Sequence, residues 1–255
     1  IDKIDRRKTN AFNIEDIRIH TPSKREGPNG LNITSQWLGI EIFEDIFSPH
    51  LSGTVLVGDA QNYLEAGPII GQEDMRIVLS TPGFDGEKSS IVKFFRIYKI
   101  SDRVIDENGK VQSYKLHFIS DDAFIDIQNK CNYSLTNMTI DSMIFKIWDK
   151  HFSVDADGAY SQGRCPSLGN YTFTLPTKSP FSCIKWLTRR ARNAFNPDDC
   201  SYVFYQDFDG YKLDTLMNLI KGPIASDGMY EYKLKNIQTE TARTTEQLSV
   251  IPEKV

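Results

Sequence analysis

The sequence lacks the residue clusters that identify most metalloproteins and many hydrolases. None of its four cysteines forms a C-x-x-C pair, so the paired ligands of a zinc site are missing. Its four histidines show no H-E-x-x-H spacing, and no G-x-S-x-G segment surrounds a serine. These absences argue against a structural zinc site, a zinc hydrolase and a serine hydrolase. We expect free thiols in a reducing cytoplasm at Cys131, Cys165, Cys183 and Cys200.

Long apolar runs and a strong charge bias are also missing. No run reaches the roughly 18 apolar residues that a membrane helix requires, and residues 1–30 are polar and charged, unlike a signal peptide. The formal net charge is −4, with both signs interspersed along the chain. Such a distribution argues against a dedicated nucleic-acid surface. We expect no membrane insertion by this chain.

The acidic residues do not form a catalytic or metal-binding set. The Asp-Asp pairs at 121–122 and 198–199 consist of adjacent carboxylates, which point apart rather than across a cleft. The segment DFDG (207–210) begins with the spacing of a calcium loop, but its twelfth position holds Asn218 instead of glutamate. Apolar residues flank this segment, so we predict a hairpin bend there and a similar bend at 155–158. We predict no catalytic residue, no metal, no cofactor and no enzyme activity.

Alternating apolar and polar residues predict strands in the first part of the chain. A polar lead-in includes a short strand near 12–19, and the segment WLGIEIF (37–43) then alternates with period two. Residues 51–60 are rich in β-branched side chains, and residues 73–82 form a further strand that ends at a Pro-Gly pair. The connection between these two strands carries at most one helical turn.

The clearest signal is a long hairpin. Its predicted arms cover 91–104 and 110–120, and the Asn-Gly pair at 108–109 suits a tight turn. In the second arm, one face carries Tyr114, Leu116 and Phe118, and the other carries Ser113, Lys115 and His117. A two-stranded ribbon of this length is stable only within a larger sheet.

After residue 120 the hydrophobic period becomes helical. Residues 139–152 form an amphipathic helix with Thr139 as its N-cap. Ser179-Pro180 begins a second helix, expected to run through Phe195, and residues 202–208 and 210–216 form a strand pair. The basic cluster falls near the end of the second helix, where it either faces a protein partner or complements the helix dipole; it consists of Arg189, Arg190 and Arg192.

These patterns predict an α+β fold. A β-rich domain, an antiparallel sheet or barrel with the long hairpin, covers residues 1–120. A small α/β domain is inserted over 121–222. Residues 223–255 begin another β domain or form a polar C-terminal tail.

The order of these segments resembles the baseplate hub proteins of T4-like contractile-tailed bacteriophages and their relatives in type VI secretion. The segment IEIFEDIFSPHLSGTVLVGDAQNYLEAGPIIGQEDMRIVLSTPG is similar to the start of a hub tube domain. FRIYKISDRVIDENGKVQSYKLHFIS is similar to the tube-lining hairpin that follows it. SPFSCIKWLTRRARNAFNPDDCSYVFYQDFDGYKL matches the hub order of Ser-Pro-Phe, helix and Asp-Gly hairpin. The likeness covers about residues 12–216.

The resemblance implies a structural virion protein in the tail baseplate, assembled in the host bacterial cytoplasm. It implies a homotrimer that contacts the tail tube protein, a central spike protein and neighbouring baseplate proteins, with the tape measure protein in the lumen. A tube-like β domain would occupy 1–120, and 223–255 would begin a second one. The candidate lumen-lining positions are Lys93, Ser113, Lys115 and His117.

Two other functions remain open at this point. A receptor- or carbohydrate-binding β module at a tail tip would use Trp37 and tyrosines to stack on sugars. A cell-wall hydrolase at the tail tip is less favoured, because the sequence shows no spaced carboxylate pair, metal cluster or nucleophile motif.

Overall fold

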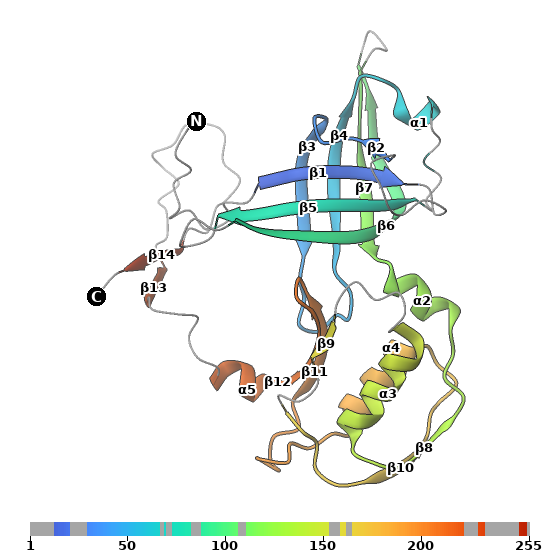
Figure 1. The fold of residues 1–255 in the computed structure, drawn as a ribbon, viewed down its shortest axis with the longest axis vertical. Coiled ribbons are helices and arrows are strands. Elements are labelled where there is room, and N and C mark those ends of the chain that lie inside the picture. Colours follow the sequence, from blue (N-terminus) through green and yellow to red (C-terminus); the bar gives the residue numbers. More distant parts are fainter. Residues whose placement is uncertain are drawn as a thin grey trace.

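A seven-stranded antiparallel sheet dominates the first half of the chain in the computed structural model (Figure 1). The structure describes residues 13–20, 30–66, 69, 73–82, 88–106, 111–152, 159–161, 165–221, 229–232 and 250–253. The strand order is β2-β1-β5-β6-β7-β4-β3. The strands are β1 (Asn13–His20), β2 (Leu31–Asn32), β3 (Trp37–Phe43), β4 (Ser52–Asp59), β5 (Asp74–Pro82), β6 (Lys88–Ile105) and β7 (Gln112–Ser120). One short helix, α1 (Tyr63–Ala66), follows β4, in agreement with the prediction of at most one helical turn in this connection.

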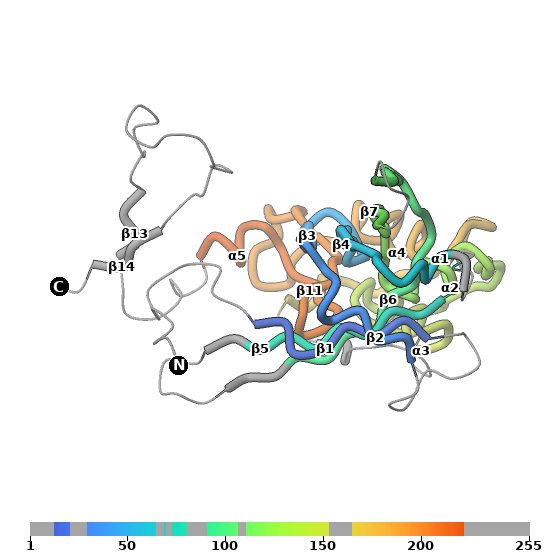
Figure 2. Tube along the Cα trace, turned by 90° about the horizontal axis from the view of Figure 1, so that it is seen from above, coloured from blue at the N-terminus to red at the C-terminus, as the bar shows by residue number. Residues whose placement is uncertain are grey.

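The sheet curls because β6 bends. Its first half pairs with β5 and its second half pairs with β7. Register shifts fall between Ile97 and Lys99 and between Ser101 and Val104. Such bulges bend a strand and increase its twist. As a result β1 and β5 cross β3 and β4 (Figures 1 and 2), which makes a half-barrel and confirms the predicted fold class.

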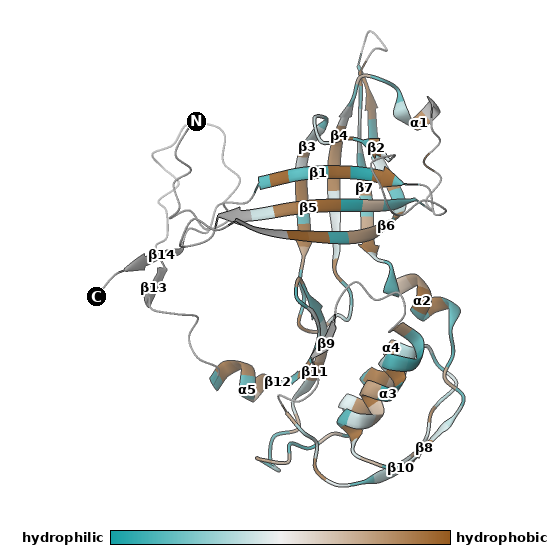
Figure 3. Cartoon of the chain, in the orientation of Figure 1, coloured by the Kyte–Doolittle hydropathy of each residue, from teal (hydrophilic) through white to brown (hydrophobic). Residues whose placement is uncertain are grey.

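The curled sheet encloses one hydrophobic core. Alternating residues of both halves point into it, and the alternation of hydrophobic and hydrophilic positions is visible along the strands in Figure 3. Tyr114, Leu116 and Phe118 of β7 are fully buried, whereas Ser113, Lys115 and His117 are half-buried on the opposite face. The predicted two-faced strand is therefore confirmed. The predicted turn at 108–109 lies outside the described residues.

The second half of the chain builds a separate core from helices and short strands. Its elements are α2 (Asp122–Gln128), β8 (Ser134–Met138), α3 (Ile140–Phe152), β9 (Ala159–Ser161), β10 (Tyr171–Thr174), α4 (Pro180–Thr188), β11 (Tyr202–Asp207), β12 (Gly210–Thr215) and α5 (Leu216–Lys221). Beyond them β13 (Met229–Tyr232) pairs with β14 (Val250–Glu253). No helix among the described residues is long and apolar enough to cross a membrane.

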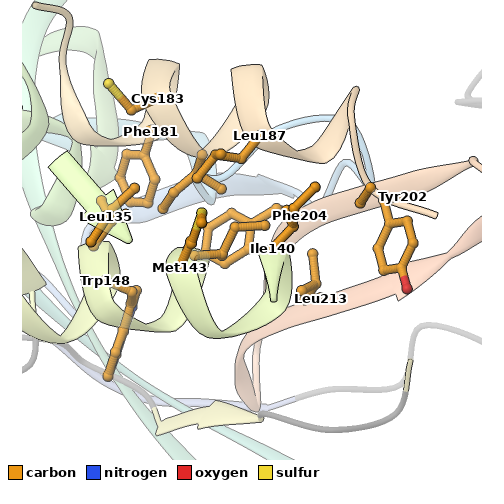
Figure 4. Close-up of a cluster of buried hydrophobic side chains, with 14 of the residues drawn as sticks. Leu135, Ile140, Met143, Trp148, Phe181, Cys183, Leu187, Tyr202, Phe204 and Leu213 are labelled. Atoms are coloured by element: carbon orange, nitrogen blue, oxygen red, sulfur yellow. The ribbon is translucent and has the colours of Figure 1, made fainter. Parts of the chain in front are cut away.

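Helices α3 and α4 pack against the sheet β11-β12-β9 (Figure 4). The buried stripe of α3 contains the five apolar positions that its periodicity predicts. Helix α4 ends earlier than expected, at Thr188, so the basic cluster follows the helix instead of lying within it. The reason is a competing pairing, because backbone groups of Arg192 and Ala194 bond to Leu168 and Pro166.

The DFDG segment is a bend, as predicted. Asp207 pairs with Gly210, whose φ of 131° favours glycine. The amides of Asp209 and Gly210 donate to Asp207 Oδ1 at 2.9 and 3.1 Å. Lys212 forms an ion pair with Asp207, so that carboxylate is already used. The other predicted bend, at 155–158, lies outside the described residues.

The two hydrophobic cores meet near residue 120. One draws its buried side chains from residues 17–118 and the other from residues 131–213. The division into domains 1–120, 121–222 and 223–255 stays a prediction.

Gly53 provides a test of the sheet packing. A Cβ at this position would lie 2.3 Å from the Glu41 carbonyl oxygen and 2.5 Å from the Phe118 ring. We expect Gly53→Ala to lower the free energy of unfolding by about 1–3 kcal/mol, because backbone cannot yield as a flexible side chain can. Gly39→Ala is the matched control, since nothing lies within 4 Å of its added Cβ. Equal denaturation midpoints for the two variants would contradict this packing.

Candidate functional site

The outer polar face of the sheet is the first candidate for an assembly surface. We use this name for Thr54 of β4, Lys99 and Ser101 of β6, and Ser113, Lys115 and His117 of β7. Directly paired residues of antiparallel strands point to the same side. His117 lies opposite both Thr54 and Lys99, and Lys115 lies opposite Ser101. Lys115 also lies opposite Leu56, and Ser113 lies opposite Gly58 and Val104, so the three β7 positions share one face with both polar and apolar neighbours.

This face is held by polar contacts of its own. Ser101 Oγ lies 2.8 Å from His117 Nε2, and Lys115 Nζ lies 3.9 Å from an Asp102 carboxylate oxygen. Burial lowers the pKa of His117, and the neighbouring charges of Lys99 and Lys115 lower it further. The imidazole is therefore neutral at pH 7, and the face presents hydroxyls, an imidazole and lysines to solvent.

Lys93 does not belong to the outer polar face. It lies opposite the buried Ile77 of β5, on the core side of the sheet, and is only 7% exposed. The bulge between Ile97 and Lys99 explains the difference. Odd-numbered residues of β6 point outward after the bulge and inward before it, so counting by twos places Lys93 on the wrong face.

A buried polar network joins the two cores. Gln206 Oε1 accepts from the Leu51 amide at 3.1 Å and from the Ser120 hydroxyl at 2.6 Å. At the same junction the ring of His50 packs edge-on against Phe181, with centroids 4.9 Å apart. The Phe208 amide donates to Glu44 at 3.0 Å. These contacts fix the second core against the sheet.

A hollow of about 150 Å³ opens beside this network, and we call it the junction groove. Its walls come from the β3–β4 connection, from α4 and from β11. Most of its lining is apolar, and two basic residues stand among the lining side chains. The lining residues are Ile46, Phe47, Pro49, Phe181, Ile184, Lys185, Thr188, Arg189, Tyr202, Val203 and Phe204.

The three residues of the predicted basic cluster are exposed and make different contacts. Arg189 lines the junction groove. The guanidinium of Arg190 instead stacks over Trp186 at 3.9 Å and donates to the Trp186 carbonyl at 2.8 Å. Arg192 is exposed, and its carbonyl accepts from the Leu168 amide. Arg189 and Lys185 are the basic residues that share a surface.

A thiol–imidazole contact lies inside the second core. Cys131 Sγ is 3.5 Å from His151 Nε2, and both Cys131 and Cys183 are fully buried. A hydrogen bond with Cys183 lowers the pKa of Cys131, while the same bond and burial raise that of Cys183. Both residues are fully buried and pack within the second core, which confirms the predicted core location of Cys183.

Sequence reasoning missed the junction residues. Gln206 meets Leu51 across 155 residues and Ser120 across 86. No local period or motif marks such contacts. The one available signal is a polar residue within an apolar strand, since Gln206 interrupts VFYQD.

His50 makes the junction sensitive to acid. Burial lowers its pKa to about 4, below the unfolded value near 6.5. The native state therefore binds this proton less readily than the unfolded state does. The packed, neutral imidazole contributes its full share of the free energy of unfolding above pH 6.5, and that share is lost as the pH falls toward 4. Over that window we expect wild type to lose up to about 1.4 kcal/mol per pH unit more than His50→Phe. Denaturation of both chains at pH 7, 5.5 and 4.5 measures the difference, and parallel curves would contradict it.

Gln206 gives a second test of the junction. Gln206→Leu removes one acceptor from each of two buried donors, the Ser120 hydroxyl and the Leu51 amide, and leaves them their bonds to each other. At about 0.5–1.5 kcal/mol per hydrogen bond, the loss should be about 1–3 kcal/mol. Lys212→Leu, on the neighbouring strand and half-buried, serves as the control and should cost less than about 1 kcal/mol. Urea denaturation compares them, and equal losses would argue against the network.

No protein-family model and no curated protein sequence matches the chain. Solved structures do match its fold. A chain of the half-lidded Francisella PdpA–VgrG complex has a TM-score of 0.50 and 15% identity, over 89% of this chain and 35% of that one. The 43 kDa tail protein of prophage MuSo2 from Shewanella oneidensis has a TM-score of 0.49 and 10% sequence identity, over 78% of this chain and 52% of that protein. Prophage tail protein gp18 of Listeria monocytogenes has a TM-score of 0.48 and 13% sequence identity, over 86% of this chain and 56% of that protein.

The chain thus spans about half of each tail protein and a third of the complex chain. Its structural neighbours include prophage tail proteins and the PdpA–VgrG complex. The half-barrel with its attached α/β core is accordingly the fold that this chain shares with a chain of the PdpA–VgrG complex.

Proposed function

We propose that this chain is a non-enzymatic structural protein of a phage tail, the central hub that starts the tail tube. It forms a homotrimer that matches the tube to a trimeric spike. Residues 1–120 serve as the tube-like domain, 121–222 as an inserted α/β domain, and 223–255 as the start of a second tube-like domain or a tail.

The open edge of the curled sheet carries this proposal. Strand β3 ends the sheet order, so in the described part of the chain no further strand pairs with its outer edge. It exposes Leu38 by 63% and Phe43 by 53%, which is unusual for an edge that must stay in water. A long apolar edge is a template for pairing with another chain, and closing a ring removes it.

The outer polar face fits the wall of a wet lumen. Ser113, Lys115 and His117 present hydroxyl, ammonium and imidazole groups to water, while the opposite face of β7 fills the core. Lys93 is excluded from this role because it lies on the core side. In the assembled tail this face would contact the tape measure protein.

The proposed partners are those that the resemblance to hub proteins implies. One rim of the ring would meet the tail tube protein and the other the central spike protein, and the inserted domain would reach neighbouring baseplate proteins. The protein would be located in the virion baseplate after assembly in the host bacterial cytoplasm. Junction contacts that fix the inserted domain to the sheet support a role in load transfer.

Substitution at the open edge tests the proposal. We expect Leu38→Lys to raise the chain concentration needed for half-assembly by about tenfold or more, because each edge then buries a charge. Ile127→Lys is the control, since Ile127 is 75% exposed on α2, away from the edge. Native mass spectrometry with and without the spike protein of the same tail gives the readout. A wild-type chain that stays monomeric with the spike present, and binds glycans specifically, would overturn the hub proposal.

A further inference from the structure

The junction groove has the chemistry of a docking site for a bulky apolar side chain next to a carboxylate. Phe47 is 60% exposed at its wall and Ile46 is 40% exposed, so apolar surface there remains in water. Lys185 and Arg189 supply positive charge, and no acidic residue lines the groove. The closest acids along the chain, Glu44 and Asp45, are not among its lining residues, and they accept from the Phe208 and Phe47 amides.

A matching knob exists elsewhere on the same chain. The Phe195 turn, our name for residues 193–199, exposes the Phe195 side chain by 81%. The turn is rigidly held, since the Phe195 amide donates to Asn193 Oδ1 at 2.9 Å and the Asp199 amide to the Asn196 carbonyl at 2.9 Å. Asp198 is exposed three residues after Phe195. A turn whose backbone is held by its own hydrogen bonds loses little backbone entropy when it binds.

We propose that the Phe195 turn of one subunit inserts into the junction groove of the next subunit. Phe195 would pack against Phe47 and Ile184, and Asp198 would pair with Lys185 and Arg189. The knob does not fill the groove of its own subunit, because Phe195 is largely in water. This knob-and-groove contact is heterologous, and with a rotation of about 120° per subunit such a contact closes a ring of three subunits. The inference rests on the proposed trimer and names a contact that would build it.

The two other apolar residues of similar exposure, Ile220 and Ile127, fit the groove less well. Ile220 is 79% exposed, but Lys221 follows it and would repel the basic lining. Ile127 is 75% exposed, but the carboxylate of the adjacent Asp126 is engaged by the Phe181 amide at 2.6 Å. Phe195 combines an apolar anchor with an exposed acid.

The first experiment removes the anchor. We expect Phe195→Ser to raise the concentration of half-trimerisation of the full chain by about thirtyfold or more, as loss of an interface hot spot does. Ile220→Ser, at nearly equal exposure, should leave it unchanged. Both side chains are exposed, so both variants should fold, which thermal unfolding checks. Analytical ultracentrifugation gives the readout.

Charge exchange then tests the pairing itself. Asp198→Lys and Lys185→Glu should each weaken the trimer, and the double variant should recover most of the loss, because the ion pair is restored with reversed sign. Failure of the double variant to recover would overturn the assigned contact.

The outcomes separate this inference from the hub proposal. A trimer, or a three-to-three complex with the spike, that Phe195→Ser leaves intact would overturn the knob-and-groove contact and leave the hub proposal standing. A wild-type chain that is monomeric alone but joins the tail tube or spike protein would also overturn the contact. A chain that neither self-associates nor binds either partner would overturn both.

Discussion

The bend in β6 is the constraint on which the rest of the structure depends. This strand belongs to both halves of the sheet, pairing with β5 along its first half and with β7 along its second. Without the bulges after Ile97 and Ser101 the sheet would stay open, and the side chains that now fill the core would face water. The curl also determines which face of β7 remains polar and leaves β3 at the free edge. The proposed assembly surfaces are thus consequences of a local change in register.

The second core is tied to this sheet by polar groups that water cannot reach. Gln206 bridges to Leu51 and Ser120 of the sheet region. Within the second part of the chain, Tyr211, which lies opposite Gln206, donates to Asp122 of α2 at 2.5 Å. Each of these groups would be costly to leave unpaired in the interior. Polar contacts of this kind specify one relative placement of the two cores, whereas apolar contacts alone tolerate sliding. A part that transmits load benefits from such a fixed placement.

Local patterns predicted the local structure well. The period-two alternation of β7, the amphipathic stripe of α3 and the bend at 207–210 each depend on residues close in sequence. Lys93 shows where counting by twos along a strand fails. A single extra residue at a bulge reverses the face on which the preceding residues of the strand lie. The early end of α4 arises from pairing with residues 166–168, and the junction network from residues more than 80 apart. Neither leaves a period in the sequence.

Electron cryomicroscopy of the assembled tail tests the central claim most directly. The account predicts three copies of the chain in one ring between the tail tube and the spike, with Ser113, Lys115 and His117 facing the channel. Six copies, a position outside the tube axis, or a channel lined by another face of the chain would contradict it.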